Sequence, residues 1–214
     1  MSPQDRHAAV VATMKLAPVI PVLTVRDVAD GVAQARALVA GGLPAIEVTL
    51  RTPAALAAIA EIARSVPGAH VGAGTIVDPE QIQAAVDAGA RFLVSPGTSP
   101  ALAAAAAQAP IPFLPGIATP SEAMTLRALG FRAMKLFPAE AVGGAKLLAS
   151  IYGPLSDIVF CPTGGIDAAK APSYLALPNV LCVGGSWMLP KAALEAGDYA
   201  QVEAIAREAA KLKG

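Results

Sequence analysis

The stretch LVAGGLPAIEVTLRTP, residues 38–53, contains one joint of a repeating α/β unit. An alanine-rich helix is predicted to end near Gly41, and the apolar run 45–50 that follows predicts a buried strand. Thr52 and Pro53 then predict another helix, with Thr52 as its N-cap and Pro53 as its first residue. A helix end, a short buried strand and a helix start in one joint indicate parallel strands connected by helices.

The same joint recurs along the chain. Glycine junctions of this kind stand at AVDAGARFLV, residues 85–94, and at LRALGFRAMKLF, residues 126–137. Helix starts recur as well, each as a capping side chain, a proline and a Gln or Glu: Asp78, Pro79 and Gln81, then Thr119, Pro120 and Glu122. We therefore predict that one βα unit is repeated along most of the chain.

Eight apolar runs are strand candidates: 18–25, 45–50, 70–76, 91–97, 112–118, 132–138, 157–163 and 179–185. Their starts are about 20 to 27 residues apart, the length of one βα unit in a small (β/α)8 barrel. We predict a single α/β domain over residues 1–214, a (β/α)8 TIM barrel with an extra N-terminal helix before residue 18. A doubly wound open sheet is the alternative. Eight near-equal units, and no G-x-G-x-x-G motif after the first strand, favour the barrel.

Composition argues against several classes of function. The 214 residues carry 16 basic and 16 acidic side chains without a basic cluster, so neither nucleic acid nor a membrane is an expected partner. The uncharged stretch 92–121 is long enough to span a membrane, but its prolines would break a helix repeatedly. Cys161 and Cys182 lie in apolar runs and are expected to be core residues in a reducing compartment. No signal-peptide pattern is present near the N-terminus, so a cytoplasmic protein is expected.

Polar residues at the carboxyl ends of the strands are the functional candidates, because TIM barrels place their active sites there. Glu47, Thr49 and Arg51 are two residues apart and share one face of the second strand, while the residues between them are apolar. The apolar face suits the helix layer, so we predict that the polar face points into the barrel. A purely structural Glu47–Arg51 ion pair is the alternative, because buried charges are usually paired.

The sixth strand presents one lysine to the interior. Ala133, Lys135 and Phe137 share the predicted inner face, whereas the remaining lysines are interpreted as solvated charges: Lys15, Lys146, Lys170, Lys191, Lys211 and Lys213. Burial favours the neutral amine of a lysine, and a free amine in a dry pocket is the nucleophile that forms a Schiff base with a ketone. The alternative is a lysine fully paired with an inner carboxylate such as Glu47, which would also be placed to shuttle its protons.

The seventh and eighth strands each end in a pair of glycines. The segments are CPTGGI, residues 161–166, and VGGSWM, residues 183–188. Paired glycines let backbone N–H groups approach an anion, and the N-terminus of a following helix favours negative charge. Because TIM barrels frequently bind phosphate after these two strands, we predict a phosphate site here. Tight turns without a ligand are the alternative.

Other strand ends contribute weaker signals. Thr75 follows the third strand and Pro96 the fourth, and turn formation explains both nearly as well as a role in a pocket. His7 and His70 are assigned no role. No H-x-x-H, D-x-D or Cys/His cluster stands at the strand ends, so no metal site is predicted and no cofactor is expected.

Eight segments together resemble a known family. They are PVIPVLTV, LVAGGLPAIEVTLRTP, VGAGTIV, FLVSPGTS, LPGIATPSE, KLFPAE, CPTGGI and LCVGGSWMLP. In this order they resemble the class I 2-keto-3-deoxy-6-phosphogluconate (KDPG) aldolases and 4-hydroxy-2-oxoglutarate aldolases over roughly residues 16–190. The combination of E-V-T-L-R, K-x-F-P-A-E and P-T-G-G-I is highly specific. One departure is Leu136, where the family often has an aromatic, and this position faces away from the predicted interior.

The resemblance implies a role for each candidate residue. Lys135 would form the Schiff base and Glu47 would act as the acid/base. The groups that hold the pyruvate-end carboxylate, and the apolar walls around them, would be Arg51, Thr75, Phe137 and Pro96. The phosphorylated end of the substrate would contact Thr163, Gly164, Gly165, Gly184, Gly185 and Ser186.

The resemblance also implies an activity, that of an aldehyde-lyase of the Entner–Doudoroff pathway. The substrate would be 2-dehydro-3-deoxy-6-phosphogluconate, which is cleaved to pyruvate and glyceraldehyde 3-phosphate. Cleavage of 4-hydroxy-2-oxoglutarate to pyruvate and glyoxylate is a second expected reaction, and the family is usually a homotrimer. The alternatives are a relative acting on the C4 epimer of the substrate, a phosphate-binding barrel isomerase without an imine, and a non-catalytic binding or assembly protein.

Overall fold

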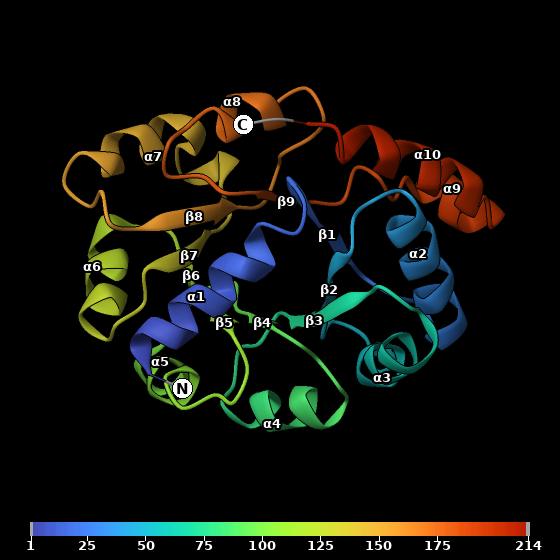
Figure 1. The fold of residues 1–214 in the computed structure, drawn as a ribbon, viewed down its shortest axis with the longest axis horizontal. Coiled ribbons are helices and arrows are strands. Elements are labelled where there is room, and N and C mark those ends of the chain that lie inside the picture. The colour runs from blue at the N-terminus through green and yellow to red at the C-terminus, as the bar shows by residue number, and fades with distance from the viewer. Residues whose placement is uncertain (1, 213–214) are drawn as a thin grey trace.

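The fold consists of parallel strands curled about a common interior, with helices on the outside (Figure 1). The computed structural model describes residues 2–212. Two parallel sheets have the strand orders β5-β4-β3-β2-β1-β9 and β6-β7-β8. The strands are β1 Val19–Leu23, β2 Ala45–Thr49, β3 His70–Gly74, β4 Leu93–Val94, β5 Phe113–Leu114, β6 Gly116–Ile117, β7 Ala133–Leu136, β8 Val159–Pro162 and β9 Val183–Gly185. The predicted α/β class with parallel strands is confirmed.

Helices alternate with the strands, as the repeated joint predicted. They are α1 Pro3–Met14, α2 Val28–Ala40, α3 Ala55–Ser65, α4 Glu80–Asp87, α5 Pro100–Ala106, α6 Pro120–Ala128, α7 Gly144–Tyr152, α8 Ala171–Leu175, α9 Lys191–Ala196 and α10 Tyr199–Ala209, with a 3-10 turn at Glu140–Val142. Among residues 2–212, no helix has both the length and the apolar character needed to cross a membrane.

The fifth predicted strand, over 112–118, is broken into β5 and β6. Pro115 lies at the break and has no N–H to donate to a neighbouring strand, although its carbonyl accepts the Lys135 amide at 2.8 Å. β5 pairs with β4 and β6 pairs with β7, so the two sheets meet at this residue. β8 and β9 are joined by two isolated parallel bridges, Phe160–Val180 and Thr163–Gly184. Within residues 2–212, the eight continuous strands that we predicted are therefore nine shorter ones in two sheets.

The two faces of the strands separate into two apolar clusters. The inner cluster contains Ala45, Ala133 and, from neighbouring strands, Ile20, Phe92, Val94, Leu114, Cys161 and Cys182. The outer cluster contains Ile46, Val48, Met134 and Leu136, which pack with the helices. Residues two apart thus share a face, as the period of a strand requires. This confirms the assignment of inner and outer faces made from the sequence for the second and sixth strands, and the core positions of both cysteines.

Helix α1 closes one end of the interior. Val10 and Met14 are buried in the inner cluster, and in Figure 1 the helix lies across the middle of the curled sheets. The Thr13 hydroxyl lies 3.2 Å from Nε2 of His70, the first residue of β3, so α1 covers the amino ends of the strands. The predicted extra helix is confirmed, and the carboxyl ends stay open on the opposite side.

One of the three predicted helix starts is confirmed and two are wrong. Thr119 and Glu122 form a complete capping box at α6. Thr52 does not cap α3, because its hydroxyl donates instead to the carbonyl of Val25 at 2.9 Å. Helix α4 likewise begins without a side-chain cap from Asp78. At both wrong positions the chain makes extra turns before the helix begins.

Asp30 is a buried carboxylate that joins the first turn of α2 to α10. It accepts hydrogen bonds from Arg26, from Gln34 and from the hydroxyl of Tyr199 at 2.9 to 3.2 Å, and the residue is 4% exposed. Burial alone would raise the pKa of Asp30, but the hydrogen bonds from Arg26 and Gln34 outweigh it and hold the pKa below its usual value.

At pH 7, the free energy of unfolding of the Asp30→Asn variant is expected to be about 1–3 kcal/mol lower than that of the wild type, because hydrogen bonds to a charged group are lost. Since the folded-state pKa is the lower one, this stabilisation is present above the unfolded-state pKa of about 3.9 and disappears as pH falls through the folded-state value. Urea unfolding at pH 7 and pH 3 measures the loss of stability and its dependence on pH. Asp87→Asn, on the exposed surface of α4, is the control. The prediction would be contradicted if the difference in free energy of unfolding between wild type and variant did not become smaller at pH 3.

Candidate active site

Lys135 and Glu47 form a buried ion pair across the interior. The Nζ atom of Lys135 on β7 lies 3.0 Å from Oε1 and 3.2 Å from Oε2 of Glu47 on β2. The two residues are 4% and 3% exposed, and they belong to different sheets. The Glu47–Arg51 pair considered from the sequence is not formed. The expected inward position of Lys135 is confirmed, and so is its pairing with the inner carboxylate.

Gly74 makes room for the Glu47 carboxylate. A Cβ atom at position 74 would lie 2.2 Å from Oε1 of Glu47, closer than atoms can approach. Gly74 is the register partner of Thr49 on the neighbouring strand, so the carboxylate lies across the backbone of β3. This role was not predicted from the sequence. Its signal was a glycine at the end of a strand beside a strand that carries an inward carboxylate.

Arg51 and Thr75 meet beyond the ends of β2 and β3. The Nε atom of Arg51 donates to the Thr75 hydroxyl at 3.2 Å. Thr75 has a φ of +61°, in the left-handed region that a β-branched residue rarely adopts, and such a conformation costs about 1–3 kcal/mol. The surrounding structure therefore holds the Thr75 hydroxyl against the guanidinium at the expense of local strain. The sequence placed both residues at strand ends, and the structure brings them into contact.

A cavity of about 150 Å³ opens in front of the lysine. The Nζ atom of Lys135 lies 5.5 Å from the centre of the Phe137 ring, a distance at which a cation is attracted to an aromatic face. The cavity is lined by Val22, Arg51, Lys135, Phe137, Thr163, Gly164, Gly165, Ile166, Gly185 and Ser186. It therefore brings together candidates from strands far apart in the sequence. Val22 and Ile166 were not predicted, because their apolar side chains carry no chemical signal.

The glycine pairs are required where the chain turns or packs closely. Gly164 and Gly165 have φ values of +106° and +77°, which other residues adopt only with strain. A Cβ at Gly184 would lie 2.2 Å from the Thr163 hydroxyl oxygen, and one at Gly185 would lie 2.1 Å from the Trp187 ring. Backbone conformation accounts for the first pair of glycines and close packing for the second. At the same time, the backbones at 164, 165 and 185 are left open to the cavity.

Pro96 lies apart from the cavity. It is half-buried, and its backbone lies against Gly116, where a Cβ would come within 2.4 Å of the Pro96 carbonyl carbon. Gly116 is the register partner of Lys135, so Pro96 is one strand away from the ion pair. Its role as an apolar wall stays a prediction. Gly184 also does not line the cavity, although it packs against Thr163, which does.

The remaining lysines that the structure describes lie on the surface, as predicted, and one of them contacts the turn after β8. Lys15, Lys146, Lys170, Lys191 and Lys211 are exposed, and Lys213 lies outside the described residues. The Nζ atom of Lys170 donates to the carbonyl of Gly165 at 2.8 Å. This lysine is therefore hydrogen-bonded to the glycine loop after β8, residues 163–165. The contact was not predicted from the sequence, because it spans a turn.

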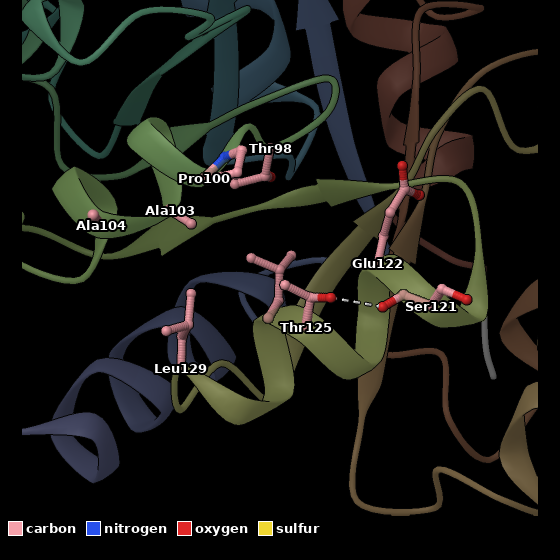
Figure 2. A pocket seen from close by; sticks show the side chains of 9 residues that line it. Thr98, Pro100, Ala103, Ala104, Ser121, Glu122, Thr125 and Leu129 are labelled. Carbon is pink, nitrogen blue, oxygen red and sulfur yellow. Dashed lines mark hydrogen bonds between the residues drawn. The ribbon is translucent and has the colours of Figure 1, made fainter.

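A larger cavity, of about 400 Å³, lies between α5 and α6 (Figure 2). Its lining is alanine, leucine, proline and hydroxyl side chains with one carboxylate, Glu122. That carboxylate accepts the backbone amides of Ala118 and Thr119 at 2.7 and 2.8 Å, so helix capping occupies it. The residues that line this cavity include no amine, thiol or imidazole.

The fold and the site define an α/β enzyme equipped for imine chemistry on an anionic ketone. A buried amine touches a carboxylate at the open ends of parallel strands, and an arginine and glycine backbone line the adjoining cavity. The family is identified by comparison, since the family model for KDPG and KHG aldolase matches residues 10–205. The chain belongs to this family.

Individual relatives agree with the family match. The KHG/KDPG aldolase of Escherichia coli (strain K12) is 52% identical over 192 residues, 90% of each chain. The 2-dehydro-3-deoxy-phosphogluconate aldolase of Pseudomonas aeruginosa is 46% identical over 206 residues, 96% of this chain and 94% of the relative. A crystal structure of KDPG aldolase from Legionella pneumophila, with pyruvate captured at low pH as a covalent carbinolamine intermediate, superimposes with a TM-score of 0.91. It is 40% identical and covers 94% of this chain and 98% of its own.

Proposed function

We propose that the protein is a class I aldolase that cleaves 2-dehydro-3-deoxy-6-phosphogluconate to pyruvate and glyceraldehyde 3-phosphate. The observation that carries the proposal is the Lys135–Glu47 pair, in which an amine and its proton acceptor are 3.0 Å apart at the edge of a cavity. Membership of the family agrees with this chemistry. The same pair argues against a barrel isomerase without an imine and against a non-catalytic protein, since neither needs a buried amine.

The first half of the reaction forms the imine. Glu47 takes a proton from the Lys135 ammonium, and the free amine attacks C2 of the substrate ketone. Glu47 then gives its proton to the C2 oxygen, relays a second proton from nitrogen to that oxygen, and water leaves. The product is a protonated imine on Lys135, with Glu47 again a carboxylate. Both oxygens of Glu47 are within 3.2 Å of Nζ, so no other side chain is needed for these transfers.

The second half breaks the C3–C4 bond. Glu47 takes the proton of the C4 hydroxyl, the bonding electrons move into the imine, and glyceraldehyde 3-phosphate leaves as the aldehyde. The enamine that remains on Lys135 takes a proton at C3 from Glu47, and water then hydrolyses the imine to pyruvate. The protonated nitrogen is the electron sink for the bond cleavage.

The other cavity residues orient the substrate. Arg51, held by Thr75, would bind the carboxylate at C1, since guanidinium pairs well with carboxylate. Phe137 would cover the apolar side of the pyruvate unit. The phosphate at the far end would lie at the glycine loop after β8 and at Gly185 and Ser186, where backbone N–H groups suit an anion. Binding at this remote end helps to hold C2 near the amine.

We extend the proposal to the assembly and the setting of the enzyme. The two bridges between β8 and β9, and the continuous chain across Pro115, support one closed (β/α)8 barrel in a single domain. The homotrimer is what the resemblance to the family implies, and the cytoplasmic location is the expectation from the cysteine usage and the N-terminal pattern. Sedimentation equilibrium giving the mass of three chains would support the trimer.

Trapping with borohydride tests the proposed function. The protein is incubated with pyruvate, reduced, digested and mapped by mass spectrometry. We expect one adduct, on Lys135. No adduct, or an adduct on another lysine, would overturn the mechanism. Cleavage rates of the two C4 epimers of the phosphorylated substrate then establish its stereochemical preference.

Cleavage of 4-hydroxy-2-oxoglutarate to pyruvate and glyoxylate is a second candidate activity. The 52% identical relative from Escherichia coli is a KHG/KDPG aldolase, a name that joins both activities. The imine half of the reaction is the same for both substrates. However, 4-hydroxy-2-oxoglutarate carries no phosphate that the glycine loop could bind. We therefore expect this substrate to be cleaved with a higher KM.

The Gly74→Ala variant is expected to lower kcat by about 10- to 100-fold, because the new methyl group displaces the acid/base, which is typically worth about 10²–10⁴. The three nearest atoms, Oε1, Cγ and Cδ, all belong to the Glu47 side chain, so the fold is expected to survive. Gly97→Ala is the matched control, since a Cβ there meets no atom within 4 Å. Steady-state cleavage and thermal unfolding of both variants measure the effect. Equal activities would show that Glu47 does not need this space.

A further inference from the structure

Three hydrogen bonds to its carbonyl groups hold the loop after β8, residues 163–165. The carbonyls of residues 163–165 accept, in order, the Ala139 amide at 2.8 Å, the Glu140 amide at 3.1 Å and the Lys170 ammonium at 2.8 Å. The first two donors belong to the backbone after β7, so they are present whatever the side chains are. The third is a side chain. The peptide group between Gly165 and Ile166 is therefore the one of the three whose orientation depends on a side chain, so a single substitution can change it.

Holding a carbonyl on one side directs the next N–H to the other, because the two groups point in opposite directions across a trans peptide. Gly165 and Ile166 line the cavity, whereas Lys170 does not. Within residues 2–212, the amides of Gly165 and Ile166 donate to no other group. The hydrogen bond from Lys170 therefore turns the Ile166 amide toward the cavity, where neighbouring N–H groups form a site for an anion.

The position of Lys170 is itself fixed. The Asp167 carboxylate accepts the Lys170 amide at 2.9 Å, which shapes the turn that returns the lysine to the loop. The Lys170 ammonium also pairs with Glu140 at 3.0 Å, and the buried hydroxyl of Tyr174 donates to the same carboxylate. The hydrogen bond from Tyr174 contributes most, and that from Lys170 next, to holding the pKa of Glu140 below its usual value. The ammonium is thus placed between a backbone carbonyl and a carboxylate.

We propose that Lys170 is a positioning residue that orients the backbone amides of the glycine loop and so sets the affinity for the phosphorylated end of the substrate. It contacts no reacting atom. Its effect is confined to ligands that carry a phosphate, because the Lys135–Glu47 pair lies on other strands. This inference rests on the proposed function and adds to it the residue on which phosphate recognition depends.

The test compares Lys170→Met with Lys170→Arg and with a control, Lys191→Met, which removes another exposed ammonium, at the start of α9. For Lys170→Met, we expect KM for the phosphorylated substrate, and the inhibition constant of inorganic phosphate, to rise about five- to tenfold with kcat nearly unchanged. The pyruvate concentration that half-saturates methyl-proton exchange is expected to stay the same. Arginine keeps a donor and a positive charge, so Lys170→Arg is expected to restore most of the affinity.

Two outcomes would overturn the inference. One is an unchanged KM and phosphate inhibition in Lys170→Met. The other is a parallel loss for the phosphorylated substrate and for pyruvate, which would indicate a general structural role; thermal unfolding of the three variants checks the fold. A wild-type enzyme that exchanges no pyruvate protons and cleaves no substrate would instead overturn the proposed function.

Discussion

Replacing Lys135 with methionine is expected to lower the rate of aldol cleavage by at least about 10³-fold, because imine formation requires an amine. Methionine is similar in length to the lysine stem and fills irregular apolar space, so the shape of the interior is kept. The substitution also leaves the Glu47 carboxylate buried without its cationic partner. Breaking a buried pair in this way costs about 3–5 kcal/mol, so lost activity alone would not separate chemistry from folding.

The double variant Lys135→Met/Glu47→Gln makes that separation. It removes both charges of the buried pair, and we expect it to regain most of the stability while remaining inactive. Lys146→Met, on the exposed surface of α7, controls for the loss of a lysine elsewhere. Steady-state cleavage, borohydride trapping and urea unfolding are measured for all three variants. A folded Lys135→Met variant that cleaves within about tenfold of wild type would contradict the imine mechanism.

Replacing Glu47 with glutamine is expected to lower kcat by about 10²–10⁴-fold, the usual contribution of a positioned acid/base. The amide matches the carboxylate in shape and still reaches Lys135, but it cannot accept the proton of the C4 hydroxyl or return one at C3. The amine remains, so borohydride is still expected to trap pyruvate, only more slowly. Exchange of pyruvate methyl protons in D2O, which needs proton transfer at C3, is expected to be nearly lost.

This pattern distinguishes the two residues of the pair. A variant without the amine loses both trapping and exchange, whereas a variant without the carboxylate keeps trapping and loses exchange. Glu80→Gln, in the exposed first turn of α4, is the matched control and is expected to behave as wild type. Exchange in Glu47→Gln at the wild-type rate would mean that another group or water moves the proton.

Much of the fold was predictable because its signals are local. Capping side chains, prolines and glycines recur with each βα unit, and they mark helix starts and ends without reference to the rest of the chain. The failures had different causes. Thr52 donates to the carbonyl of Val25 rather than to its own helix, a contact that a short window of sequence does not reveal. Pro115 divides a run whose composition is otherwise that of one strand.

The sequence by itself determined which side chains face the interior. Alternation along a strand has a period of two, so Glu47 and Lys135 were assigned to the inner face from their neighbours alone. Only the tertiary structure decided which of them meet. Glu47 pairs with a lysine 88 positions away and not with Arg51 just beyond the end of its own strand, because the sheets curl and bring β2 and β7 face to face. The space at Gly74 and the bond from Lys170 to Gly165 likewise depend on which strands and loops are neighbours, which periodicity does not encode.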